Sequence, residues 1–182
     1  MQFGVGLEGV NIPYASEKGI MVANIPGELC GNAQSCAEHA IFLALGLLRN
    51  INSIPHSIKL QKLGSPIGKT LFKSTVLIYG FGSIGKELFR RVVNFSPSEV
   101  IIIQKNSNPD SLAEFSAMDF TSLRVKVLSH EEFQQMKDHE LLTEQIFICC
   151  TQNKDNLGFV NKSFLKKFRN SVNIINIARV SS

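Results

Sequence analysis

From residue 74 onward, the chain alternates between continuous apolar runs and amphipathic segments. The apolar runs are rich in Val and Ile and lack the polar alternation of a half-exposed strand, so they predict strands covered on both faces. The predicted strands span residues 74–79, 99–104, 123–128, 145–150 and 171–177, and the predicted helices span residues 83–95, 129–142 and 161–168. Strands and helices in this alternation predict an α/β fold with a parallel, doubly wound sheet.

The first 73 residues follow a different pattern. They begin with a predicted strand, short helix and second strand, over residues 2–6, 11–19 and 20–25. After a break at PGELCGNA, apolar positions at helical spacing predict a long helix over residues 32–50. We therefore divide the chain into a remnant of a first domain (1–25), a segment carrying the long helix (26–50), a connector (51–73) and a second domain (74–182).

Composition and charge argue against several classes of protein. The basic residues behind the net charge of +4 are scattered, so we expect no nucleic-acid partner. No apolar run reaches the roughly 18 residues of a membrane span, and the amino terminus lacks the pattern of a signal peptide. We expect a soluble, intracellular protein, in the cytoplasm or in an organelle. The four cysteines lack zinc-binding spacing, which predicts reduced thiols and no metal site.

A glycine-rich turn is the strongest chemical signal in the sequence. Gly80, Gly82 and Gly85 form G-x-G-x-x-G directly after a predicted strand and at the opening of a helix. The first glycine permits a tight turn, the second lets the backbone approach a pyrophosphate, and the third brings helix and strand close together. The free N–H groups of Ser83 and Ile84 would face the phosphates. The motif predicts a Rossmann-type dinucleotide site, against the alternative of a turn that merely connects two elements.

The end of the second predicted strand bears on the choice of cofactor. An acid at this position would hydrogen-bond the adenosine ribose, but the sequence has Gln104 and Lys105 there and no acid before Asp110. Without that acid a 2′-phosphate meets no repulsion, and Lys105 would attract it. This favours NADP over NAD. The alternative is that Lys105 is a solvated cation and that the site discriminates poorly.

Four longer segments, in this order, carry a resemblance to a known family. They read GVGLEGVNIPYASEKGIMVANIPG, NAQSCAEHAIFLALGLLR, PIGKTLFKSTVLIYGFGSIGKEL and FVNKSFLKKFRNSVNIINIAR. Together they resemble the D-isomer-specific 2-hydroxyacid dehydrogenases over nearly the whole chain. The resemblance implies hydride transfer between C4 of a nicotinamide and C2 of a small 2-hydroxy or 2-oxo acid. It also implies a homodimer that associates through residues 32–50.

The resemblance assigns roles to individual residues. It implies that Val5, Gly6 and the catalytic Arg179 hold the substrate carboxylate, because an arginine fork binds carboxylates with fixed geometry. The cofactor positions that it implies are Ser83 and Ile84 at the phosphates, Gln104 or Lys105 at the ribose, Cys150, Thr151 and Asn156 beneath the adenosine, and Ile177, Ala178 and Arg179 beside the nicotinamide.

The chain also departs from the family pattern. The family's general acid–base is a histidine oriented by a glutamate, both well downstream of the arginine, whereas here only VSS follows Arg179. The histidines present are one in the long helix, one in the connector and two in the predicted helix 129–142, namely His39, His56, His130 and His139. Thr151 replaces a common proline. We therefore expect an incomplete dehydrogenase chain, truncated in both domains, with negligible turnover; the alternative is a non-catalytic dinucleotide-sensing module.

Overall fold

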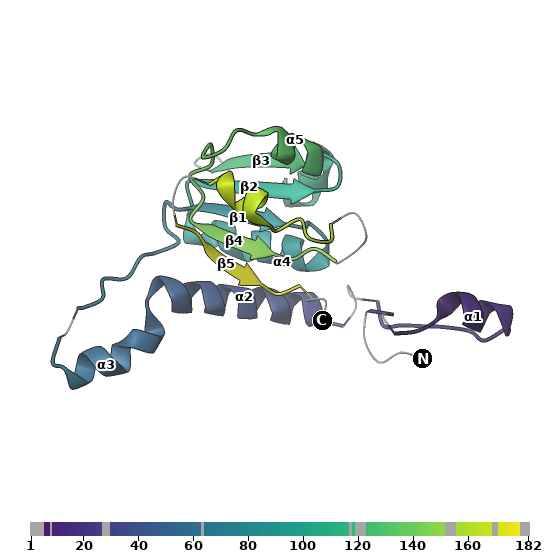
Figure 1. Cartoon of the computed structure of the whole chain (residues 1–182), viewed down its shortest axis with the longest axis horizontal. Coiled ribbons are helices and arrows are strands. Elements are labelled where there is room, and N and C mark those ends of the chain that lie inside the picture. Colours follow the sequence, from purple (N-terminus) through teal and green to yellow (C-terminus); the bar gives the residue numbers. More distant parts are fainter. Residues whose placement is uncertain are drawn as a thin grey trace.

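A five-stranded parallel sheet forms the centre of the computed structural model, with the strand order β3-β2-β1-β4-β5 (Figure 1). The strands are β1 (Thr75–Tyr79), β2 (Glu99–Gln104), β3 (Arg124–Ser129), β4 (Gln145–Ile148) and β5 (Asn173–Asn176). The structure describes residues 6–7, 9–26, 30–62, 64–116, 118, 123–151, 156–168 and 171–178. The chain runs outward from β1 to β3 and then crosses back to β4, which confirms the predicted doubly wound, Rossmann-type sheet.

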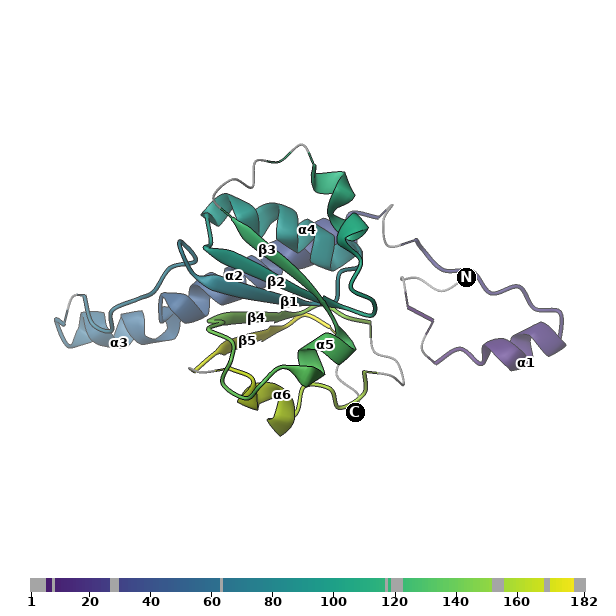
Figure 2. The ribbon, with the colours of Figure 1, turned by 90° about the horizontal axis from the view of Figure 1, so that it is seen from above.

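Helices cover both faces of this sheet. One layer contains α2 (Asn32–Leu48) and α4 (Ser83–Val92), and the other contains α5 (His130–Gln135) and α6 (Lys162–Lys166), as Figure 2 shows from above. Successive residues of β1 alternate between the layers: Val76 and Ile78 belong to the core beneath α2 and α4, whereas Leu77 and Tyr79 belong to the core beneath α5 and α6. Burial on both faces explains the continuous apolar runs in the sequence.

The long helix α2 packs closely because its inner face is lined with small side chains. It contacts α4 and β5. The buried positions of α2 recur every three or four residues and are Ala33, Ala37, Ala40, Ala44 and Leu48. On α4, Arg91 adds an ion pair to Glu38 of α2, with 3.2 Å between Nη2 and Oε1. The outer face leaves Phe42 61% exposed.

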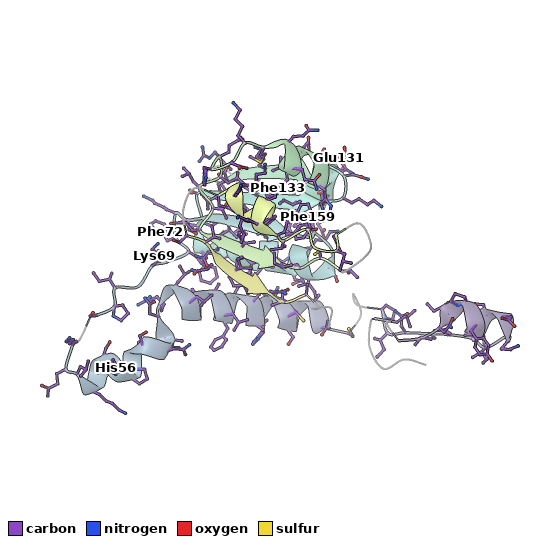
Figure 3. All side chains as sticks on the ribbon, in the orientation of Figure 1. His56, Lys69, Phe72, Glu131, Phe133 and Phe159 are labelled. Carbon is purple, nitrogen blue, oxygen red and sulfur yellow. The ribbon has the colours of Figure 1, made fainter. Side chains whose placement is uncertain are left out.

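The predicted connector has more structure than its prolines suggested. It contains η1 (Ile51–Ser53) and the short helix α3 (Ile54–Lys59), which begins with a proline in its first turn, a position that tolerates the missing N–H. The chain then returns to the sheet, and the Lys69 amide donates to the Leu48 carbonyl over 2.8 Å. Figure 3 shows His56 on α3, with Lys69 and Phe72 on the returning segment.

The amino-terminal prediction is correct for the helix and wrong for the second strand. The helix α1 (Ile12–Glu17) starts at Asn11, whose side chain accepts a hydrogen bond from the Tyr14 amide. Residues 20–25 are not part of any strand, and Met21 is 94% exposed. An apolar run becomes a strand only where a neighbour pairs with it, and Figures 1 and 2 place this segment beyond the amino end of α2, away from the sheet. Most of the predicted strand 2–6 lies outside the described residues.

The predicted helix 129–142 ends early. It stops at Gln135, and Met136 adopts extended backbone with ψ 150°. The following segment instead pairs with the end of α6, since the Leu141 amide donates to the Lys167 carbonyl over 2.9 Å. His139, which was predicted to be helical, therefore lies in a turn with φ 58°. Two further 3₁₀ turns, η2 (Val93–Phe95) and η3 (Pro109–Phe115), follow α4 and β2.

Candidate functional site

Two positions at the turn between β1 and α4 have no room for a side chain, and the first of them also has a backbone conformation that favours glycine. Gly80 has φ +96°, and a Cβ added there would come within 2.5 Å of the Cys150 amide nitrogen. A Cβ on Gly85 would overlap the carbonyl oxygen of Gly80. The turn therefore lies directly against the segment that follows β4, and the first turn of α4 lies directly against the end of β1.

The middle glycine has a different reason for its presence. Gly82 is the N-cap of α4 with φ −81° and ψ −163°, which is extended backbone open to any residue. A Cβ at this position would meet nothing within 4 Å. The space over Gly82 is thus open at the point where a bound pyrophosphate would approach the backbone.

The start of α4 offers hydrogen-bond donors to that open space. The Lys86 amide donates to the Gly82 carbonyl over 2.9 Å, which is the first bond of the helix. The preceding amides, those of Ser83, Ile84 and Gly85, accordingly have no helical acceptor. Their N–H dipoles favour an anion. The residues present fit a dinucleotide pyrophosphate, because the turn supplies both space and donors.

A polar cavity adjoins this turn. It has a volume of about 250 Å³ and is lined by Ala33, Gln34, Ser83, Lys86, Glu87, Arg90 and Glu114. An ion pair between Lys86 and Glu114, at 2.6 Å, links α4 with η3. The amino ends of α2 and α4 therefore lie side by side at the edge where the strands end.

The loop after β2 is held by the side chain that ends the strand. Gln104 donates through Nε2 to the Asn108 carbonyl over 3.2 Å and to the Ser111 hydroxyl over 3.3 Å. Its amide nitrogen is thus used within the loop. Lys105 is exposed, and so is Asp110, the first acid after the strand. Lys105 is therefore an exposed cation that directly follows the last residue of β2.

The segment after β4 lies under the glycine turn. Cys150 is half-buried, and burial raises the pKa of its thiol, so the group stays protonated at neutral pH. Burial also raises the pKa of the neighbouring Tyr79 hydroxyl and Cys149 thiol. None of the four cysteines, all of which lie in the described ranges, forms a disulfide. Farther along the chain, Asn156 Nδ2 donates a hydrogen bond back to the Thr151 carbonyl over 2.8 Å.

The end of β5 brings two more of the predicted positions to the same edge. The Ile177 amide donates to the Ile148 carbonyl over 3.1 Å, and the Ala178 amide donates to Asn176 Oδ1 over 3.0 Å. Arg179, predicted to be catalytic, lies outside the described residues, and so does Val5. Gly6 belongs to the amino-terminal segment, which Figures 1 and 2 show apart from the sheet.

Aromatic side chains fill the space between β1 and the α5–α6 layer, a feature that we did not predict from the sequence. The rings of Tyr79 and His130 each lie 4.8 Å from that of Phe159. The rings of Phe133, on α5, and Phe159 are tilted relative to one another with 5.8 Å between their centroids, and Figure 3 labels both residues. This cluster supports the end of β1, on which the glycine turn is built.

Each histidine has a place in the structure. His39 stacks on Phe42 of α2 with 6.2 Å between ring centroids, and His56 lies on α3. His130 belongs to the aromatic cluster. His139 makes a 3.1 Å hydrogen bond between Nδ1 and the Phe168 carbonyl.

Comparison with known proteins identifies the family. The sequence pattern described as "D-isomer specific 2-hydroxyacid dehydrogenase, NAD binding domain" matches residues 41–182. The chain belongs to this family. The resemblance deduced from its motifs is therefore confirmed, and residues 41–182 carry the nicotinamide-dinucleotide-binding domain of the family.

Curated relatives of the chain are oxidoreductases of this family. A hydroxypyruvate reductase of Thermotoga maritima is 32% identical over 151 residues, which cover 74% of this chain and 48% of the relative. A glyoxylate reductase/hydroxypyruvate reductase of Mus musculus is 28% identical over 183 residues, covering 96% of this chain and 50% of the relative. The chain thus spans about half the length of these two proteins.

Solved structures share the fold. A glyoxylate reductase from Paecilomyes thermophila superposes with a TM-score of 0.71 at 23% identity, over 98% of this chain and 50% of that one. A D-lactate dehydrogenase from Aquifex aeolicus, solved with NAD and lactic acid, gives a TM-score of 0.71 at 18% identity, over the same shares of the two chains.

Two further features of the described residues concern membranes and metals. Among the helices that the structure describes, none combines the length and the apolar content needed to cross a bilayer. Within the described ranges, no group of three or more His, Cys, Asp and Glu side chains is arranged to hold a metal ion.

Proposed function

We propose that the chain binds NADP in preference to NAD at the glycine turn. We further propose that it derives from an oxidoreductase that interconverts small 2-hydroxy and 2-oxo acids. When bound, the nicotinamide would supply hydride exchange between its C4 and C2 of the acid. The observation that carries this proposal is the open space over Gly82 beside the α4 amides that have no helical acceptor, in a turn where Gly80 and Gly85 leave no room for a side chain.

The proposed roles of the remaining residues follow from the resemblance and from their place at the strand ends. The amides of Ser83 and Ile84 would bind the phosphates, and Gln104 or Lys105 would meet the ribose. Cys150, Thr151 and Asn156 would lie beneath the adenosine. Ile177 and Ala178 would border the nicotinamide, while Val5, Gly6 and Arg179 would hold the carboxylate of a substrate such as glyoxylate or hydroxypyruvate.

The proposed organisation keeps the boundaries deduced from the sequence. Residues 1–25 would belong to a substrate-binding domain, residues 26–50 to the segment between domains, residues 51–73 to the connector and residues 74–182 to the cofactor domain. We propose that two copies associate through residues 32–50. The exposed Phe42 and Leu47 of α2 support this proposal, because apolar side chains left exposed on a helix favour association.

Calorimetric titration tests the cofactor proposal. We expect both NADPH and NADH to bind, with NADPH tighter by about twofold to fivefold, the range of an exposed charge pair. Lys105→Gln should remove this preference. Lys69→Gln is the matched control, because Lys69 lies at the carboxyl end of α2, about 25 Å from the site by the rise of a 17-residue helix. If neither dinucleotide bound, the whole proposal would be refuted. A strong preference for NADH would refute only the part that concerns NADP.

We expect the 182-residue chain itself to show little turnover. A general base must lie within hydrogen-bond reach of the substrate hydroxyl, and the four histidines are placed on α2, on α3, in the aromatic cluster and against Phe168. The measurement is NADPH oxidation followed by absorbance, with glyoxylate and with hydroxypyruvate. Rapid oxidation by the purified chain would contradict this expectation.

A second candidate function is a non-catalytic module in which the bound dinucleotide controls association. The exposed apolar side chains of α2 favour it, since they offer a surface for a second copy. Sedimentation with and without NADPH separates the two candidates. A change in association state on cofactor binding favours the sensing module, and an unchanged state favours the dehydrogenase lineage.

A further inference from the structure

The turn from β3 to α5 brings a carboxylate to the end of β2. Gln104, the last residue of β2, pairs in register with Ser129, the last residue of β3. Glu132 folds back onto that residue, because its Oε2 accepts from the Ser129 amide over 2.6 Å while its own amide donates to the Ser129 hydroxyl over 3.1 Å. Adjacent strands lie about 4.8 Å apart, so this carboxylate lies about one strand spacing from the end of β2.

The same carboxylate is influenced by the loop that follows β2. Ser107 of that loop and Lys126 of β3 both act on the Glu132 carboxyl in the direction that lowers its pKa. The Ser129 amide, the Ser129 and Ser107 hydroxyls and Lys126 together hold the pKa of Glu132 below its usual range. Glu132 is therefore negatively charged at neutral pH, and Ser107 follows Lys105 by two residues in the sequence.

We propose that Glu132 limits the preference of the site for NADP, by placing a negative charge beside the loop that would receive the 2′-phosphate. The proposal rests on the proposed function. In dinucleotide-binding domains an acid at the end of β2 favours NAD, and this chain has Gln104 there. Glu132 supplies a charge of the same sign from the next strand–helix turn. It opposes Lys105, so the preference of the wild-type chain is modest.

The chain offers a variant that changes only the charge. Glu132→Gln retains the reciprocal cap of α5, because glutamine serves at this position as glutamate does. Glu131→Gln is the matched control: it removes an equal charge from the same helical turn, one residue away. Figure 3 shows Glu131 on α5, on the opposite side of the sheet from α2.

Dissociation constants of NADPH and NADH for the wild-type chain and both variants test the proposal. Glu132→Gln should tighten NADPH about threefold to fivefold at low ionic strength and leave NADH nearly unchanged, since only the 2′-phosphate carries charge toward this loop. The gain should fall by about half or more in 0.3 M salt, where the Debye length is only about 5–6 Å. Glu131→Gln should have a smaller effect.

Two results would overturn the proposal. One is an unchanged ratio of the NADPH and NADH dissociation constants in Glu132→Gln, whether or not both constants shift. The other is an equal change of that ratio in Glu131→Gln. Absence of binding to the wild-type chain would overturn the proposed function as well, so the two failures are distinguishable.

Discussion

Gly82→Asp is expected to weaken dinucleotide binding by on the order of 100-fold while leaving the fold intact. The extended backbone at Gly82 suits any residue, and a Cβ there meets nothing within 4 Å. Aspartate is also a better N-cap than glycine and complements the helix dipole, so the free energy of unfolding should stay equal or rise by up to about 1 kcal/mol. The new carboxylate would occupy the space of the pyrophosphate and repel it.

Calorimetry with NADPH and thermal unfolding of the same samples measure the two halves of this prediction. Gly82→Asn is the matched control, since asparagine has nearly the same shape, caps equally well and carries no charge. We expect it to weaken binding less than aspartate does. If the aspartate variant bound NADPH as the wild-type chain does, the phosphates would have to lie elsewhere, and the assignment of the turn would be wrong.

The sheet was predictable because its strands are specified by burial. The boundaries of β2, Glu99–Gln104, agree with the prediction, since its apolar run is covered on both faces. The run at 20–25 has similar composition and forms no strand, because strand formation depends on a pairing partner that the local sequence does not encode. For the same reason α5 is shorter than predicted. The second half of the predicted helix 129–142 instead pairs with the end of α6, which is a long-range contact.

The candidate site was predictable where a single residue type is obligatory and less so where chain segments meet. Gly80 and Gly85 could be found from the sequence because the turn excludes every side chain. The approach of Glu132 to the loop after β2 depends on the register between β2 and β3, which the sequence does not state. A signal was nevertheless available, because Ser129 and Glu132 have capping-box spacing and such a cap turns the carboxylate back toward the strand end.

Gly85→Ala should lower the free energy of unfolding by about 3 kcal/mol, at the upper end of the cost of overpacking. The added Cβ would overlap the Gly80 carbonyl oxygen, a backbone atom at the end of the fully buried β1. The backbone of Gly80 has little freedom to move. Its amide donates a hydrogen bond to the Ile103 carbonyl over 2.8 Å, and the backbone of Cys150 lies against the α-carbon of Gly80. We expect α4 to be displaced and dinucleotide binding to fall with it.

Thermal unfolding measures this effect, with Gly46→Ala as the matched control. Gly46 lies within α2, and a Cβ there would make only an ordinary 3.5 Å contact with Ile51 Cγ2. Alanine is favoured over glycine in a helix interior, so Gly46→Ala should stabilise the chain by about 0.5–1 kcal/mol. The same added methyl group should thus raise the unfolding temperature at one position and lower it by roughly 6–12 °C at the other. Equal effects at both positions would mean that α4 does not lie against β1 as closely as the turn requires.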